Sequence, residues 1–266
     1  MKEGSLTDKI WITEKCAGPL VATAIHDGHE VRSDALDLMA LDEASRLREE
    51  DPWTASWTTA APNRVVGLRS RFEVDLNRPR EKAVYLTPDD AWGLEVWRGK
   101  LPSKIVDASL AEYDAFYEAL KEFYAGLESR HGRFVVFDLH TYNHRRNGPD
   151  GPEADPQANP QVNVGTGTMT DRKLWAPVID RFMADLSSFD YPGGALDVRE
   201  NVRFRGGHHG RWAHETFPRS ACVLSIEVKK IFMDEWTGEA DATLVDVVDR
   251  TIISTVPGVL EELNRL

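Results

Sequence analysis

Three polar residues that could do hydrolytic chemistry stand at or just after the ends of short apolar runs. They are His26, His140 and Glu227. Histidine nitrogen and carboxylate oxygen are ligands that zinc favours, and a catalytic zinc site keeps three protein ligands and one open position. His26 and His140 are therefore the first candidates for metal ligands. Gly28 would let the chain bend sharply after the first run, so that His26 can point into a crevice.

The third ligand should be a carboxylate or another histidine, and the sequence leaves four candidates open: His29, Glu30, Glu50 and Asp51. A residue before proline avoids helical geometry, so the helix that precedes Pro52 should end here. A carboxylate at that helix end could fold back to the end of the first strand. The alternative interpretation is a solvent-exposed acidic helix end.

Asp138 lies two residues before His140 and therefore on the same face of a strand. Its carboxylate could orient the imidazole from behind or join the metal coordination. The alternative for each histidine is structural, because a histidine can simply cap a strand end. Considered together, the candidates favour the metal site.

Glu227 stands at the end of an otherwise apolar strand. Partial burial at that position would raise its pKa towards the range that is useful for a general base. The alternative is a structural ion pair with Lys229 or Lys230, which follow it closely.

Asn77 and Arg78 offer the groups that bind a carboxylate. Arginine presents a planar fork of donors, and a neighbouring amide adds a fixed donor. A second loop, at 204–210, contains Gly206 and Gly207 and two histidines. This loop could close on a substrate or contribute a further histidine, or it could be a glycine-rich turn with exposed histidines.

The elements that must position these residues are strands that alternate with helices, which is typical of a mainly parallel sheet covered by helices. The predicted strands are 19–25, part of 64–76, 134–137 and 222–226, and the predicted helices are 33–49, 107–130, 171–187 and 240–256. Pro257 and Gly258 should end the last helix, and the segment 147–160, rich in proline and glycine, should be irregular. Sites in open α/β sheets form outside the carboxyl ends of the strands, so the polar strand ends should meet there.

The composition limits the possible functions. The 266 residues include 32 basic and 44 acidic side chains, and the net charge of −12 argues against nucleic-acid and anionic-membrane partners, although not against a local positive pocket. No apolar run approaches the roughly 20 residues that span a bilayer, and no signal peptide opens the chain. The two cysteines form no zinc motif and no disulfide framework, which favours a reducing cytoplasm.

The order of these segments resembles the N-formylglutamate amidohydrolases, within the wider zinc-carboxypeptidase-like group. The resemblance covers about residues 20–235. The segments that carry it are Ile-His-x-Gly at 25–28, Glu-Asp-x-x-Thr at 50–54, Arg-Phe-x-Val-Asp-Leu-Asn-Arg at 71–78, Val-Phe-Asp-Leu-His at 136–140, Phe-x-Gly-Gly at 204–207 and Ser-Ile-Glu-Val at 225–228.

The resemblance implies a single amidohydrolase domain over 1–266, with a mixed, mainly parallel sheet flanked by helices on both faces and an inserted loop at about 147–160. It also implies one Zn²⁺ per chain. In the relatives, zinc is held by a histidine after the first strand, an acidic residue and a later strand-end histidine. The two histidines map onto His26 and His140.

For the acidic ligand, the resemblance favours Glu50 and Asp51, because the formylglutamate family has acidic residues there. His29 and Glu30 are the less favoured choices. The catalytic glutamate of the relatives maps onto Glu227. Their carboxylate-binding pair maps onto Asn77 and Arg78, and the matching segments add Arg71, Gly206 and Gly207 as substrate-binding candidates.

The implied reaction is the hydrolysis of a small-molecule N-acyl amino acid, with N-formylglutamate as the leading substrate. One alternative is a carboxypeptidase-like enzyme that acts on short peptides or other acyl amides. A second is a metal-binding relative without catalysis. The oligomeric state stays open.

Overall fold

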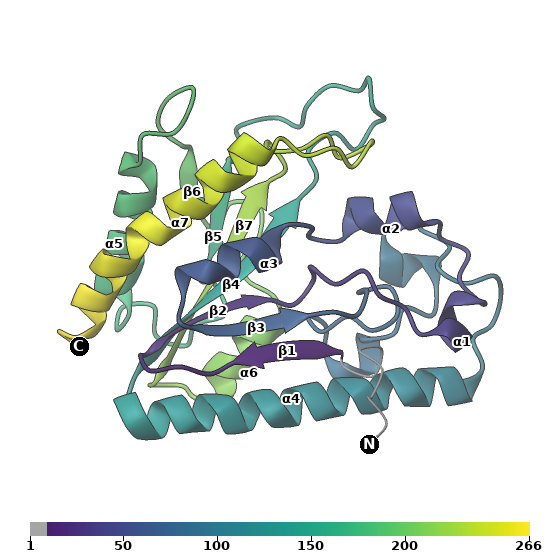
Figure 1. Ribbon diagram of the computed structural model, residues 1–266, viewed down its shortest axis with the longest axis horizontal. Coiled ribbons are helices and arrows are strands. Elements are labelled where there is room, and N and C mark those ends of the chain that lie inside the picture. The colour runs from purple at the N-terminus through teal and green to yellow at the C-terminus, as the bar shows by residue number, and fades with distance from the viewer. Residues whose placement is uncertain (1–9) are drawn as a thin grey trace, which may run out of the picture.

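The middle of the protein is a sheet whose four central strands run parallel. The computed structural model describes residues 10–266 (Figure 1). In their order across the sheet, the parallel strands are β3 (Asn63–Gly67), β2 (Leu20–Ala24), β4 (Phe134–Tyr142) and β7 (Ala221–Lys229). Their carboxyl ends therefore lie together at one end of the sheet.

Three short strands extend the sheet on both sides. β1 (Trp11–Glu14) pairs antiparallel with β3, β5 (Val162–Gly165) pairs antiparallel with β7, and β6 (Val198–Glu200) pairs parallel with β5. Within residues 10–266 the result is a seven-stranded sheet in the order β1-β3-β2-β4-β7-β5-β6. The predicted mixed, mainly parallel α/β fold is confirmed, although the sequence did not predict these short strands. As expected, 147–160 forms no helix or strand.

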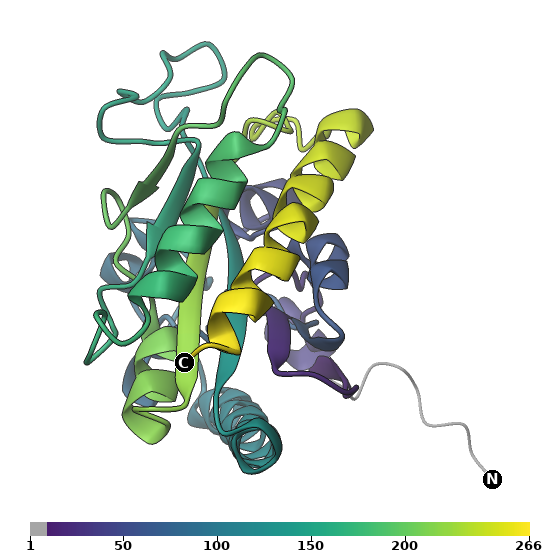
Figure 2. The same ribbon diagram turned by 90° about the vertical axis from the view of Figure 1, so that its left-hand side faces the viewer.

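Helices cover both faces of the sheet (Figures 1 and 2). α4 and α6 pack on one face, and α5 and α7 pack on the other. The helices are α1 (Ser33–Leu36), α2 (Glu43–Glu49), α3 (Thr54–Trp57), α4 (Ser103–His131), α5 (Ala176–Ser188), α6 (His208–Thr216) and α7 (Ala242–Leu263). None of the helices in the described residues combines the length and the apolar character that a bilayer crossing requires.

Successive side chains of β4 point to opposite faces of the sheet, and this alternation decides on which face its polar residues lie. Val135 and Phe137 belong to the core beneath α5 and α7, and Val136 belongs to the core beneath α4 and α6. Burial of each such side chain stabilises the fold by about 1.5–3 kcal/mol. This free energy determines which residues of β4 face each side of the sheet. Since successive residues face opposite sides, Asp138 and His140 continue the row of Val136 towards the carboxyl end of the sheet.

The predicted single helix at 33–49 is wrong, because two short helices replace it. α2 begins after Asp42, whose carboxylate accepts a hydrogen bond from the Ser45 amide (2.7 Å). Between α1 and α2 the chain turns, and the backbone of Met39 pairs with that of Trp97. This contact joins segments far apart in the sequence, so the periodicity could not reveal the break.

Predicted boundaries also change elsewhere in the chain. α7 continues through Pro257, so the predicted end of this helix is wrong. The proline removes the helical bond to the carbonyl of Ile253, but that residue is exposed and water can replace the bond. Within 64–76 only β3 is a strand, and within 204–210 the residue His208 already begins α6.

Candidate active site

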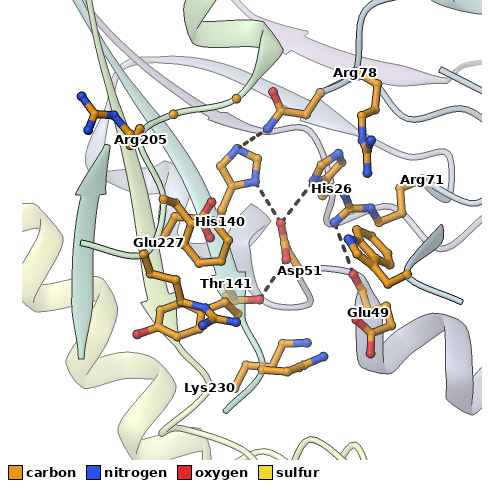
Figure 3. A pocket seen from close by; sticks show the side chains of 18 of the residues that line it. His26, Glu49, Asp51, Arg71, Arg78, His140, Thr141, Arg205, Glu227 and Lys230 are labelled. Carbon is orange, nitrogen blue, oxygen red and sulfur yellow. Dashed lines mark hydrogen bonds and ion pairs between the residues drawn. The ribbon is translucent and has the colours of Figure 1, made fainter. Parts of the chain in front are cut away.

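A cavity of about 630 Å³ opens at the carboxyl ends of the parallel strands (Figure 3). The strand register brings two candidate residues together, because His140 of β4 lies directly opposite Glu227 of β7. His26 follows β2, which pairs with β4 on its other side. The three polar residues therefore line one cavity.

His26 is held by its own loop and by one carboxylate. Gly28 is so close to the neighbouring loop that a Cβ there would lie 2.2 Å from the carbonyl carbon of Leu68. The Nε2 atom of His26 lies 2.7 Å from Asp75 Oδ1, and since a carboxylate only accepts, Nε2 carries the proton. The Nδ1 atom is buried, has no hydrogen-bond partner within residues 10–266, and faces Asp51 Oδ2 across 3.4 Å.

His140 is oriented from behind by Asp138. The Nε2 atom of His140 lies 3.2 Å from Asp138 Oδ2, and its Nδ1 atom lies 2.9 Å from Asp51 Oδ2. The other oxygen of Asp138 accepts a hydrogen bond from Thr23 (2.8 Å) and lies 2.9 Å from His209 Nδ1. Asp138 therefore orients the ring and lies outside the space that the two candidate ligands share with Asp51.

Asp51 completes the cluster because the chain after α2 folds back to the first strand. Its amide donates to the carbonyl oxygen of His26 (3.0 Å), and its Oδ1 accepts a hydrogen bond from Thr141 (3.1 Å). One ligand atom from each of His26, Asp51 and His140 lies within 4.8 Å of the other two. Figure 3 shows the two rings pointing at this carboxylate.

The charges around the cluster stabilise a cation. Burial alone would raise the pKa of Asp51, but the hydrogen bond to His140 and the neighbouring imidazole of His26 hold that pKa well below its ordinary value of 3.8. Burial would lower the pKa of His140, yet the neighbouring Asp138 carboxylate raises it well above the ordinary 6.5. Positive charge is therefore favoured between these carboxylates, and a metal ion can supply it in place of protons.

The donor set is compatible with a metal site. Two imidazole nitrogens and one carboxylate oxygen form a ligand set of catalytic zinc. Asp75 and Asp138 are the carboxylate partners that ligating histidines usually have. The buried Nδ1 of His26 is the strongest indication, because a buried acceptor without a partner costs about 1–3 kcal/mol.

The other ligand candidates lie outside this cluster. The carboxylate of Glu50 accepts a hydrogen bond from Ser70 (2.5 Å) and lies 2.5 Å from Nδ1 of His29. The side chain of Glu30 is exposed. Of the two acidic residues that the resemblance favours, only Asp51 lies between the two histidines.

Glu227 has the features of a general base. Its carboxylate lines the cavity, and burial raises its pKa from the ordinary 4.5 to about 8. Within the described part of the chain, neither Lys229 nor Lys230 forms an ion pair with it, so the structural alternative is wrong. The ammonium group of Lys230 donates instead to the carbonyl oxygens of Arg48 (2.6 Å) and Glu50 (2.9 Å) at the end of α2.

Two arginines lie beside the cluster. Arg71 Nη2 lies 2.9 Å from Asp75 Oδ2, and the guanidinium group lies 4.9 Å from the centre of the Trp92 ring. Arg78 is farther from the same carboxylate, at 3.9 Å, and its side chain is 35% exposed. Arg78 therefore has the weaker internal partner and is the better placed of the two to bind an anion.

Further cations of the cavity were not among the sequence candidates; they are Arg146, Arg203, Arg205 and Lys230. With the two arginines beside the cluster they make six cationic side chains, against three carboxylates in the lining. The cavity therefore has an excess of positive groups, although the whole chain carries −12. The only feature of the sequence that could have indicated these cations was the position of Arg203 and Arg205 beside the candidate residues Gly206 and Gly207. Figure 3 shows the side chain of Arg205 turned away from the cluster.

Asn77 connects the glycine loop with the cluster. Its side-chain oxygen accepts a hydrogen bond from the amide of His209 (2.9 Å), at the start of α6, and its nitrogen lies 3.4 Å from His140 Nε2. Gly207 lies against this side chain, since a Cβ there would be 2.2 Å from Asn77 Oδ1. Gly206 has a φ of +103°, in the region that favours glycine.

Comparisons with known proteins agree with this architecture. A family model described as N-formylglutamate amidohydrolase matches residues 18–233. The solved structure of an N-formylglutamate amidohydrolase from Ralstonia eutropha JMP134 has a TM-score of 0.72 and 17% identity, covering 96% of this chain and 98% of that one. Gene product Atu2144 from Agrobacterium tumefaciens has a TM-score of 0.64 and 16% identity, covering 95% and 97%. The two likenesses show a shared fold. A comparison with curated proteins gives no match.

Proposed function

Because the chain belongs to the N-formylglutamate amidohydrolase family, as the sequence resemblance indicated, we propose that it hydrolyses the N-acyl amide of an acidic amino acid. N-Formyl-L-glutamate is the leading substrate, and formate and L-glutamate are the products. One observation supports the proposal above others: the cluster of His26, Asp51 and His140 shares a cavity with Glu227. We further propose that the cluster holds one Zn²⁺ per chain.

The ligands of the ion would be His26, Asp51 and His140. When bound, Zn²⁺ lowers the pKa of water and polarises a carbonyl oxygen. Asp75 and Asp138 would orient the rings: each accepts from Nε2 of one histidine, which leaves the Nδ1 lone pair of that histidine for the ion.

Glu227 would act first as a general base and then as a general acid. It takes a proton from the attacking water as the water oxygen bonds to the acyl carbon. It then gives this proton to the nitrogen as the C–N bond breaks, which releases the free amine. A pKa of about 8 in the metal-free protein makes the carboxylate a stronger base than an exposed glutamate.

Arg78, with Arg71 beside it, would bind a carboxylate of the substrate. A charged group held away from the reacting bond orients that bond without taking part in the chemistry. The excess of cations in the cavity suits an acidic amino acid, because such a substrate carries two carboxylates.

We expect Arg78→Met to raise KM by about 10–100-fold, since a hydrogen bond to a charged group is worth about 1.5–3 kcal/mol. kcat should change less, and metal content should not change. Steady-state kinetics with N-formylglutamate check this. Arg80→Met is the matched control, because Arg80 is exposed and pairs with Asp114 (2.6 Å). An unchanged KM in Arg78→Met would contradict the assignment.

Gly207→Ala should lower kcat/KM while the protein stays folded. The added methyl group must displace Asn77, and a shift of about 1 Å in a positioned group can cost about 10²-fold in rate. Kinetics and the melting temperature measure the two effects separately. Gly99→Ala is the control, because no heavy atom lies within 4 Å of a Cβ at that position. Equal losses in both variants would argue against a role for Asn77.

The proposed reaction is tested with a panel of formyl, acetyl and succinyl derivatives of glutamate and with dipeptides. The protein is loaded with Zn²⁺ and the released amine is quantified. We expect the highest kcat/KM with N-formylglutamate. A preference for dipeptides would indicate a carboxypeptidase-like enzyme, and bound zinc without any turnover would indicate a non-catalytic relative.

A further inference from the structure

A row of buried polar side chains continues from His140 away from the cavity. The row passes from β4 to α6 and then to α4, through Asp138, His209 and Tyr124. Asp138 Oδ1 lies 2.9 Å from His209 Nδ1, and His209 Nε2 lies 3.0 Å from the hydroxyl of Tyr124. None of the four residues is more than 2% exposed.

We propose that His209 is a positioning residue for the metal site. It holds the carboxylate of Asp138 against the ring of His140, and this contact fixes the direction of His140 Nδ1. The inference rests on the proposed metal site and adds a residue of α6 to it.

The reason lies in the hydrogen bonds of Asp138. A buried carboxylate needs several donors to offset the loss of water. On Oδ1 these are Thr23, at 2.8 Å, and His209, at 2.9 Å. On Oδ2, the hydroxyl of Ser225 is more distant, at 3.5 Å. Without His209, Oδ1 of Asp138 keeps Thr23 as its one close donor. The carboxylate can then turn towards Thr23 and away from His140.

His209 is fixed well enough to do this. Its backbone amide donates to Asn77 Oδ1 (2.9 Å), and its ring is held between Asp138 and Tyr124. Since a carboxylate only accepts, the Nδ1 atom of His209 carries a proton and donates the hydrogen bond to Asp138. The ring therefore cannot turn without breaking a buried hydrogen bond.

A second buried histidine on the same helix provides a matched control. His214 is 2% exposed. Its Nδ1 atom lies 3.0 Å from Thr168 Oγ1, and its Nε2 atom accepts a hydrogen bond from the amide of Val223 (3.1 Å). These contacts hold a loop and a strand, and neither reaches Asp138.

The test compares His209→Gln, His209→Asn and His214→Gln with the wild-type protein. The affinities for Zn²⁺ and Co²⁺ are measured by competition with a chelator, without substrate. The amide nitrogen of asparagine takes the position of Nδ1, whereas the amide of glutamine extends to the position of Nε2. If Asp138 turns away, His140 loses its carboxylate partner, so we expect His209→Gln to bind about 10–100-fold more weakly, the usual effect of losing a partner of a ligand. His209→Asn should recover most of this loss, and His214→Gln should bind like the wild type.

Unchanged affinity in His209→Gln, or an equal loss in His214→Gln, would overturn the inference. If His209→Gln does not fold, Tyr124→Phe tests the same row by removing one hydroxyl group, and unchanged affinity there would also overturn it. If the wild-type protein binds neither ion, the proposed metal site fails, and this inference fails with it. Wild-type binding with no effect at His209 overturns this inference alone.

Discussion

Glu227→Gln is expected to abolish the hydrolysis of N-formylglutamate and to leave metal binding intact. The amide of glutamine has nearly the size of the carboxylate, but it cannot take a proton from the attacking water. General base catalysis contributes about 10²–10⁴-fold, so kcat should fall by at least that factor. Initial rates of formate release and the metal content of the same sample check both parts.

Glu49→Gln is the matched control for this experiment. Glu49 also lines the cavity, but its carboxylate pairs with Arg146 at 3.4 Å. It should therefore retain most of kcat. Full activity in Glu227→Gln would remove the proposed base. Loss of the metal together with the activity would assign Glu227 to the metal site instead.

The raised pKa of Glu227 also predicts how the stability of the metal-free protein depends on pH. Burial raises this pKa from 4.5 to about 8, so the folded state binds the proton more tightly than the unfolded chain does. Below pH 4.5 the group is protonated in both states and has no effect on stability. Above it the wild type is progressively destabilised, until the effect is complete above about pH 8. The melting temperature of Glu227→Gln should therefore exceed that of the wild type near pH 8, and the difference should vanish below pH 4.5.

Asp51→Asn is expected to remove metal binding and activity together. The substitution takes away the carboxylate that faces His26 Nδ1 at 3.4 Å and His140 Nδ1 at 2.9 Å. Losing a charged ligand should exceed the roughly 10–100-fold effect of losing a partner of a ligand. Chelator competition measures the affinity, and formate release measures the activity.

The neighbouring carboxylate is a stringent control. Glu50 is equally buried, but it bonds with Ser70 and His29 and not with the cluster. Glu50→Gln should therefore keep the metal, even if its melting temperature falls. The opposite result, with metal lost from Glu50→Gln and retained by Asp51→Asn, would contradict the proposed ligand set.

The centre of the fold could be predicted from the sequence because buried parallel strands are continuous apolar runs. Such runs gave β2, β4 and β7, and with them the positions of His26, His140 and Glu227 at the strand ends. The short outer strands were not predictable, because β1 and β5 have four residues each and β6 has three. Runs this short lack a measurable period.

The identity of the acidic residue in the cluster could not be predicted. Glu50 and Asp51 are adjacent, and only the backbone turn after α2 decides which carboxylate faces the histidines. The contacts of His209 were not predicted for a different reason: its partners, Asp138 and Tyr124, are 71 and 85 positions away. No local pattern records such contacts.

The cavity and the rest of the protein carry opposite signs of charge, and this affects how an anion is captured. Outside the cavity, an anion meets a chain with a net charge of −12, whereas the lining has six cationic side chains. At physiological ionic strength the Debye length is about 8 Å, so distant acidic groups are largely screened while the nearby arginines are not. Added salt first reduces the long-range repulsion and only later weakens the local attraction. Anion capture should therefore be fastest at an intermediate salt concentration.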